Sequence, residues 1–124
     1  MSQIDDIEID DEHPIPNLEV IDVWTVLKEG GCRMFVIIAS PLQGDRRSLE
    51  RLMCKLERYL AYLKSDECVE RCGEATVENT TIIVAIHPAS SHFAFELLER
   101  NKAWVSNNDA TLVIDRDGIL ERTH

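Results

Sequence analysis

Residues 20–61 read VIDVWTVLKEGGCRMFVIIASPLQGDRRSLERLMCKLERYLA, and this stretch decides the fold. Its first part, Val20 to Leu27, is rich in β-branched and aromatic residues, which predicts a strand. Gly30 and Gly31 predict a turn, because glycine adopts positive φ without steric cost. The run from Arg33 to Ser40 is almost continuously apolar, which is typical of a central strand or one buried on both faces. Together these segments predict an antiparallel hairpin.

An amphipathic helix is expected directly after the hairpin. Residues 41–47 predict a loop, and Ser48 is a candidate N-cap for the helix. Apolar residues then recur at helical spacing and lie along one line of the helix surface. This line consists of Leu49, Leu52, Met53, Leu56, Leu60 and Leu63. A further short turn of helix is predicted to start at Ser65 or Asp66 and to stop at Gly73.

The rest of the chain alternates between strand and helix patterns. Residues 80–87 (TTIIVAIH) predict a third strand, residues 92–106 a second helix, and residues 110–115 (ATLVID) a fourth strand. The order strand, strand, helix, strand, helix, strand predicts an α/β two-layer sandwich, with a four-stranded mixed sheet and two helices on one face. The second sheet face would then need another chain or the N-terminal segment as its cover. A turn at Asp117-Gly118 is expected before a short C-terminus.

The formal net charge of −10 is concentrated near the N-terminus. Residues 1–17 combine acidic residues, few apolar residues and two prolines, which predicts an acidic, flexible tail before a single domain at 18–124. Phosphate backbones repel a strongly acidic chain, which argues against nucleic acid and anionic membrane as partners. No run approaches the ~20 apolar residues of a membrane span, and the N-terminus lacks the pattern of a signal peptide. We therefore expect a cytoplasmic protein with reduced cysteines.

Two motifs resemble a known family. These are the strand start Val20-Ile21-Asp22 and the helical stretch KLERYLAYL at 55–63. They are similar to those of a family of small bacterial α/β proteins classed as a domain of unknown function, whose members show a V-I-D strand, a hairpin and a long helix with a K-L-x-x-Y-L-x-F/Y-I/L pattern. The resemblance covers residues 19–115 and implies the same fold, but it implies no catalytic residues. The acidic leader and the Cys68/Cys72 pair depart from the family pattern.

The cysteines are the first candidate site. Cys68 and Cys72 are four residues apart, which on a helix places both thiols on one face. A closed zinc site needs four ligands, so Cys54 and His87 would have to converge with this pair. The spacing falls short of the two-pair patterns that mark zinc sites. We therefore expect free thiols, with no metal and no cofactor.

The turn between His87 and His92 is the second candidate site. It joins a strand end to a helix start, a position where α/β folds tend to place binding sites. Either histidine could serve as a general base, and the helix start could hold an anion. However, the turn has no glycine-rich phosphate loop and no carboxylate nearby in sequence, so loop and surface histidines are the simpler interpretation. The residues of this candidate ligand site are His87, Ser90, Ser91 and His92.

A basic strip is the third candidate. Its members lie on the side of the first helix opposite the leucines, and they are Arg47, Arg51, Lys55 and Arg58. The strip is either a solvated face or a surface that binds an acidic partner, including the protein's own tail. Phe95 and Tyr62 are expected away from the apolar faces of their helices, where aromatics can anchor an interface. Phe95 is therefore added to the four basic residues as a candidate interaction residue.

These observations predict a function without identifying a reaction. No serine or cysteine lies in a nucleophile motif. The sequence favours a small cytoplasmic, non-catalytic domain that acts through protein–protein contacts, as a homodimer and with a further protein partner left open. The alternative is a small-molecule-binding protein or small enzyme that uses the turn around His87–His92.

Overall fold

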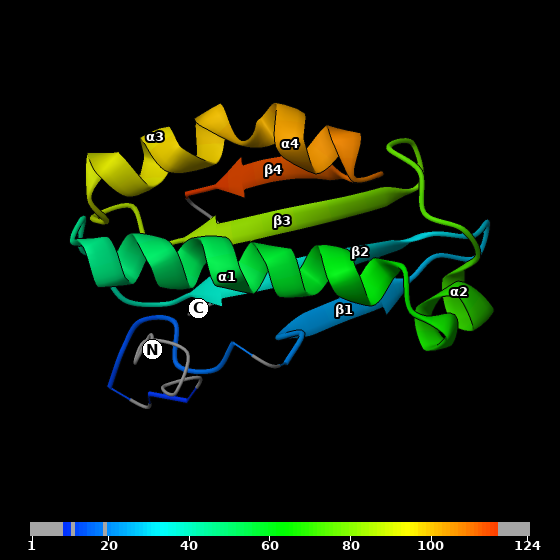
Figure 1. Cartoon of the computed structure of the whole chain (residues 1–124), viewed down its shortest axis with the longest axis horizontal. Helices are drawn as coiled ribbons and strands as arrows, with labels where there is room; N and C mark the ends of the chain where they lie inside the picture. The colour runs from blue at the N-terminus through cyan, green and yellow to red at the C-terminus, as the bar shows by residue number, and fades with distance from the viewer. Residues whose placement is uncertain (1–8, 11, 19, 117–124) are drawn as a thin grey trace, which may run out of the picture.

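The computed structural model describes residues 9–10, 12–18 and 20–116. These residues form β1 (Val23–Val26), β2 (Cys32–Ile38), α1 (Arg46–Leu63), α2 (Asp66–Cys72), β3 (Thr80–Ile86), α3 (His92–Arg100), α4 (Lys102–Asn107) and β4 (Thr111–Asp115). The strands make one sheet in the order β1-β2-β3-β4 (Figure 1). β1 pairs with β2 in antiparallel fashion, and the β2–β3 and β3–β4 pairs are parallel. The predicted four-stranded mixed sheet with helices is therefore confirmed.

The helices differ from the prediction. The further short turn of helix that the sequence predicts is α2, which adds a third helical segment to the expected order, and the predicted second helix is divided into α3 and α4 at Asn101. Asn101 has φ −100° and ψ 9°, and its side-chain amide donates a hydrogen bond to the Leu97 carbonyl. A short polar side chain that bonds to the local backbone in this way competes with the regular helical ladder. The amphipathic pattern continues across this break, which explains why the sequence predicts one helix.

The start of α1 also differs from the prediction. The N-cap is Asp45, three residues before Ser48. The Asp45 carboxylate accepts hydrogen bonds from the Ser48 amide at 3.2 Å and from the Ser48 hydroxyl at 2.7 Å. At the other end of α1, Ser65 caps α2 and Gly73 ends it, as the sequence predicts.

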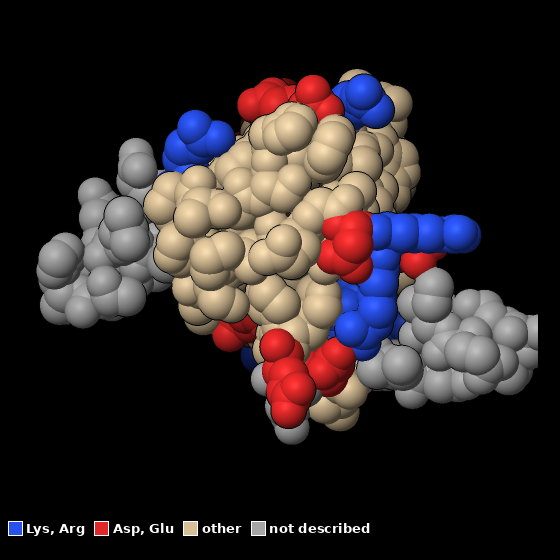
Figure 2. Space-filling model, turned by 90° about the vertical axis from the view of Figure 1, so that its left-hand side faces the viewer, with Lys and Arg blue, Asp and Glu red and all other residues tan. Residues whose placement is uncertain are grey.

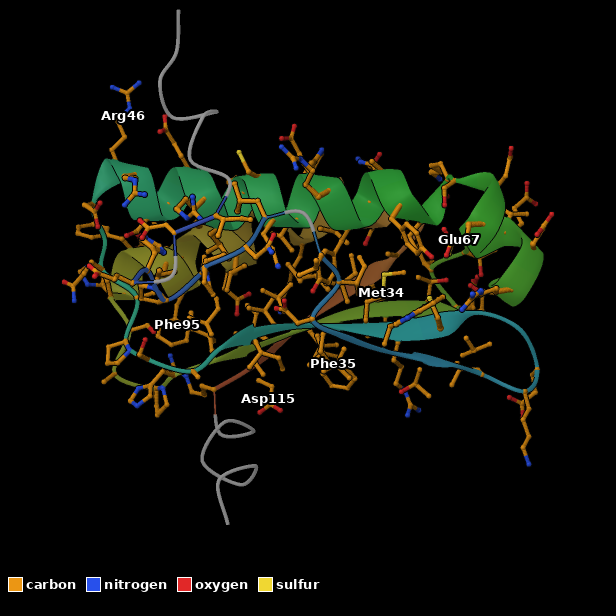
Figure 3. All side chains as sticks on the ribbon, turned by 90° about the horizontal axis from the view of Figure 1, so that it is seen from below. Met34, Phe35, Arg46, Glu67, Phe95 and Asp115 are labelled. Atoms are coloured by element: carbon orange, nitrogen blue, oxygen red, sulfur yellow. The ribbon has the colours of Figure 1, made fainter. Side chains whose placement is uncertain are left out.

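The core lies between the sheet and the helices. α1 and the α3–α4 pair lie on one side of the sheet (Figure 3). On this side, Met34, Val36 and Ile38 of β2 are fully buried. On the opposite side, Phe35 and Ile37 of the same strand are only partly buried. β2 is thus a central strand whose apolar run is completely covered on one face alone.

Part of the expected tail belongs to the domain. Ile15 and Leu18 are 1% and 3% exposed and join the hydrophobic core. Their segment lies beside α1 on the helix side of the sheet (Figure 3). The packed domain therefore begins at least three residues before the boundary expected at residue 18. Residues 1–8 and the turn expected at Asp117-Gly118 lie outside the described residues. Within the described part of the chain, each helix is too short or too polar to cross a lipid bilayer.

Candidate functional site

The basic strip of α1 contacts the protein's own N-terminal segment. Arg51 and Lys55 are both 1% exposed, so a solvated face is wrong for these two residues. The Arg51 guanidinium donates to the Ile15 carbonyl from Nε at 3.0 Å and from Nη2 at 2.6 Å. Arg47 forms an ion pair of 2.5 Å with Asp10. A partner protein could reach Arg51 and Lys55 only by displacing this segment. Arg58, the fourth member of the strip, is half-buried.

Lys55 is the centre of a buried polar network. Its ammonium donates to the Asn17 carbonyl, to the Val20 carbonyl at 2.8 Å and to the Asp22 carboxylate at 3.0 Å. An ammonium group has three protons to donate, so these three acceptors satisfy it completely. A buried charge is tolerated when it is both paired and hydrogen-bonded in this way.

The same network binds backbone groups of β2 at the edge of that strand, next to the point where β1 begins. The second Asp22 carboxylate oxygen accepts from the Ile37 amide at 3.0 Å. The Tyr59 hydroxyl donates to the Phe35 carbonyl at 2.5 Å and accepts from the Asp22 amide at 2.9 Å. Burial raises the pKa of Tyr59, which keeps this hydroxyl protonated as a donor. These two side chains take the place of strand partners, and β1 is correspondingly shorter than the sequence predicts.

The network explains the two motifs noted in the sequence. Asp22 is the acid of the V-I-D motif, and Lys55 and Tyr59 are the lysine and tyrosine of the K-L-x-x-Y-L pattern. In this protein the motifs join the N-terminal segment, α1 and the sheet through direct hydrogen bonds. Their role here is therefore structural.

A second hydrogen-bonded chain lies at the start of α1. His13 Nδ1 accepts from the Ile15 amide at 2.9 Å, and His13 Nε2 lies 3.0 Å from the Ser48 hydroxyl. Because Nδ1 is the acceptor, the proton is assigned to Nε2, which donates to Ser48. Ser48 in turn donates to Asp45. The serine proton thus points to the carboxylate and away from the histidine, which is the reverse of a nucleophile and its base. Burial lowers the pKa of His13.

The turn after β3 uses its polar side chains to hold the backbone. His87 Nδ1 accepts from the Ala89 amide at 3.0 Å. The Ser90 hydroxyl, which is buried, accepts from the Leu42 amide at 2.9 Å. The Ser91 hydroxyl caps α3. These contacts join the turn to the loop between β2 and α1.

The outer side of this turn offers few charges to a ligand. His92 is exposed and stacks on Phe93, with ring centroids 4.2 Å apart. Figure 2 views this end of the molecule and shows a mainly uncharged surface with Lys, Arg, Asp and Glu at its rim. Two depressions of about 410 Å³ and about 330 Å³ lie beside Lys64, and His87 and His92 line neither of them. These two depressions therefore do not support a ligand site at the turn between His87 and His92.

Phe95 and Tyr62 are not the exposed aromatics that the sequence suggested. Phe95 is partly buried against the core, and the Arg116 guanidinium carbon lies 4.1 Å from its ring centroid. Tyr62 packs edge to face on Trp24 at 5.7 Å. The aromatic that α3 exposes is Phe93, at 51%. Both phenylalanines flank the buried line of α3, so tertiary contacts decide which of them is covered.

The sheet face opposite the helices carries an apolar row that crosses all four strands. Its members are register partners on successive strands, namely Val23, Phe35, Ile83 and Val113. Val23 and Val113, at the two ends, are 46% and 40% exposed. The neighbouring row on one side is Thr25, Arg33, Thr81 and Thr111, and the row on the other side is Ile37, Ala85 and Asp115. Figure 3 shows Phe35 and Asp115 on the side of the sheet away from α1.

Three of the four cysteines converge near the C-terminal end of α1. The sulfur atoms of Cys32, Cys68 and Cys72 lie within 4.8 Å of one another, and all three residues are buried. Burial and the neighbouring thiols raise the pKa of Cys32 to about 12 and that of Cys68 to about 11. The third member is Cys32, and neither Cys54 nor His87 belongs to the group. No motif in the sequence joins Cys32 to the other two, because the contact depends on a long-range hydrogen bond from the Gly31 amide to the Cys72 carbonyl. Thiols are ligands for soft metal ions.

Comparison of the chain with protein-family models, with curated proteins and with solved structures found no match. The resemblance to a bacterial family of unknown function therefore stays a prediction. Function has to be inferred from the residues of this protein and their geometry.

Proposed function

We propose that this protein is a non-catalytic domain that acts through protein–protein contacts and that it forms a homodimer through the open face of its sheet. The observation that carries the proposal is the apolar row of Val23, Phe35, Ile83 and Val113, which runs across the whole sheet. Contiguous apolar patches on soluble proteins mark interaction surfaces. Two sheets that meet face to face bury such rows between them.

The charges beside the row suit a second copy of the same chain. Arg33 lies in the row on one side and Asp115 in the row on the other side. A two-fold axis along the apolar row places the Arg33 side of one copy over the Asp115 side of its partner. Arg33 and the partner's Asp115 then lie on the same side of the apolar row, two strands apart, so the attraction between them is long-range and favours this arrangement of the two copies.

The hydroxyls near the histidines support a non-catalytic role. The Ser48 hydroxyl donates to Asp45, and the Ser90 and Ser91 hydroxyls accept from backbone amides. None of the three is arranged as a nucleophile beside a base. We place the protein in the cytoplasm, whose reducing conditions keep cysteines as the free thiols present here.

Sedimentation equilibrium at micromolar concentration tests the proposal. The expected mass is twice that of the 14.2 kDa chain. Val113→Lys introduces a charge into the apolar row and should yield a monomer that remains folded by circular dichroism. Val69→Lys changes an equally exposed valine on α2, outside the sheet, and should leave the dimer intact.

Two results would overturn this proposal. One is a 14.2 kDa mass at every concentration. The other is a dimer that Val113→Lys leaves unchanged, since the interface would then lie elsewhere.

A further inference from the structure

We propose that Cys32, Cys68 and Cys72 form a three-thiolate site for a thiophilic ion that takes three sulfur ligands, with trivalent arsenic as its representative. Their sulfur atoms lie within 4.8 Å of one another, so one ion between them can contact all three after small side-chain rotations. The three cysteines lie on the helix side of the sheet or on α2, away from the open face proposed for the dimer.

Backbone contacts hold the three cysteines together. α2 places Cys68 and Cys72 one turn apart on the same face. The Gly31 amide donates to the Cys72 carbonyl at 2.6 Å, which joins the end of α2 to the hairpin directly before Cys32. Gly31 has a φ of 88°, and a Cβ atom there would lie 2.0 Å from the Asn79 carbonyl oxygen. Only glycine permits this close approach, so the position of Cys32 is built into the backbone.

The number of donors selects the kind of ion. Structural zinc sites are completed by four protein ligands, and catalytic zinc sites by three ligands and a water molecule. In the part of the chain that the structure describes, this group consists of three residues. Each of the three is at most 4% exposed, which leaves no open side for water. Three enclosed sulfur atoms suit an ion that is satisfied by three ligands.

Charge neutrality favours a trivalent ion. A net charge that is buried away from water is costly. Three thiolates cancel the charge of a trivalent ion, whereas a zinc ion would leave one negative charge and a cuprous ion two. The neutral combination is therefore the one that this buried site accommodates best.

The binding reaction of arsenous acid, As(OH)₃, is balanced with the thiols alone. Each S–H group gives its proton to one hydroxide on arsenic, an As–S bond replaces the As–O bond, and one water molecule leaves. Three thiols thus release three waters, arsenic stays trivalent, and no sulfur is oxidised. The exchange starts from the protonated thiols, so free thiolates need not form first.

Titration of the fully reduced protein with arsenite, without small thiols in solution, tests the site. We expect one arsenic per chain, and Cys32, Cys68 and Cys72 should be alkylated more slowly with arsenite than without it, whereas the alkylation of Cys54, measured by mass spectrometry, should be the same in both. Cys54→Ser should leave the stoichiometry unchanged, because this residue lies outside the group. Cys68→Ser removes a direct ligand and should weaken arsenite binding by more than about 100-fold, which is the upper range for the loss of a group that only supports a ligand.

Zinc in the same titration is the comparison. Tighter binding of zinc than of arsenite would overturn the assignment to a three-coordinate ion. Equal rates of alkylation of Cys32, Cys68 and Cys72 with and without excess arsenite would overturn the site itself. The alkylation experiment uses the unaltered protein, so it gives a decision even if Cys68→Ser does not fold.

Discussion

Two groups of buried titratable side chains, one at the middle of α1 and one beyond its C-terminal end, differ in their surroundings. The ammonium of Lys55 meets three acceptors, one of them a carboxylate. The thiols of Cys32, Cys68 and Cys72 meet one another, and their mutual contacts raise the pKa of Cys32 further. Burial alone therefore does not reveal the role of such a group. A buried charge with a full set of partners holds the fold, whereas a buried set of like ligands is suited to receive a cation.

Among the substitutions that test this contrast, Lys55→Met should cause the largest loss of stability. The change keeps the length of the side chain but leaves the Asp22 carboxylate and two carbonyls without their donor. Removal of one partner from a buried pair costs about 3–5 kcal/mol. We expect about 3 kcal/mol in the free energy of unfolding measured in urea, at the lower end of that range because the Asp22 side chain is 23% exposed.

The matched control for this change is Lys64→Met. Lys64 pairs with Asp109, and both side chains are 51% exposed. Exposed pairs contribute little, so we expect a loss below about 1 kcal/mol. Equal losses for the two lysine variants would contradict the structural role assigned to the Lys55 network.

The next effect is expected from Tyr59→Phe. The ring stays in place, but the Phe35 carbonyl and the Asp22 amide lose their partner. A buried group left without a hydrogen bond costs about 1–3 kcal/mol. We therefore expect the free energy of unfolding to fall by about 2 kcal/mol in the same urea experiment. Tyr62→Phe is the control and should change stability by less than about 0.5 kcal/mol, as a substitution near the surface. No loss in Tyr59→Phe would mean that water replaces the hydroxyl.

A smaller effect is expected from Cys68→Ala. This change removes one neutral sulfur atom and leaves no charged group without a partner. Its cost should resemble that of deleting a single buried methyl group, about 1 kcal/mol. A loss as large as that of Lys55→Met would show that the thiol group holds the fold, and the contrast between the two groups would fail.

The smallest effect concerns pH and His13. Burial lowers the pKa of His13 in the folded protein below its ordinary value of 6.5, with Arg51 and Arg47 acting in the same direction and Asp10 and Asp45 opposing them. As the pH falls, the unfolded chain therefore takes up the proton first. The stability that neutral His13 contributes is present above the ordinary pKa and is lost as the pH falls through the folded pKa.

Thermal melts between about pH 7 and about pH 5 measure this loss. We expect a slight fall in Tm for the unaltered protein and a shallower one for His13→Gln. His92 is exposed, so His92→Gln should keep the slope of the unaltered protein. Identical slopes for all three proteins would contradict the role of the His13 contacts.

The sheet could be predicted from local patterns, because β2, β3 and β4 are short apolar runs and a glycine pair marks the hairpin. α1 could be predicted from the spacing of its leucines. The burial of Lys55 could not, since helical periodicity locates one covered face and the N-terminal segment covers a second. The burial of Ile15 could not be predicted from composition either, because one apolar residue hardly changes the mean hydropathy of an acidic segment.

The candidate sites were harder to predict than the fold. The Cys68/Cys72 pair is visible as a four-residue spacing, but Cys32 joins it through the hydrogen bond from the Gly31 amide to the Cys72 carbonyl. Such a hydrogen bond depends on tertiary structure. Phe93 and Phe95 have equivalent positions about the buried line of α3, and the contact of Phe95 with Arg116 distinguishes them. Helical phase contains no information about that contact.

The way in which Asp22 and Tyr59 close the edge of β2 has a consequence for aggregation. An unpaired strand edge is a template onto which another chain can add its own strand. Here the Ile37 amide and the Phe35 carbonyl are already bound by side chains of the same molecule. The two side chains therefore prevent the strand of another molecule from pairing with this edge and starting a fibre. Their loss would expose this template as well as lower stability, so the corresponding variants should precipitate earlier than their free energies of unfolding alone would suggest.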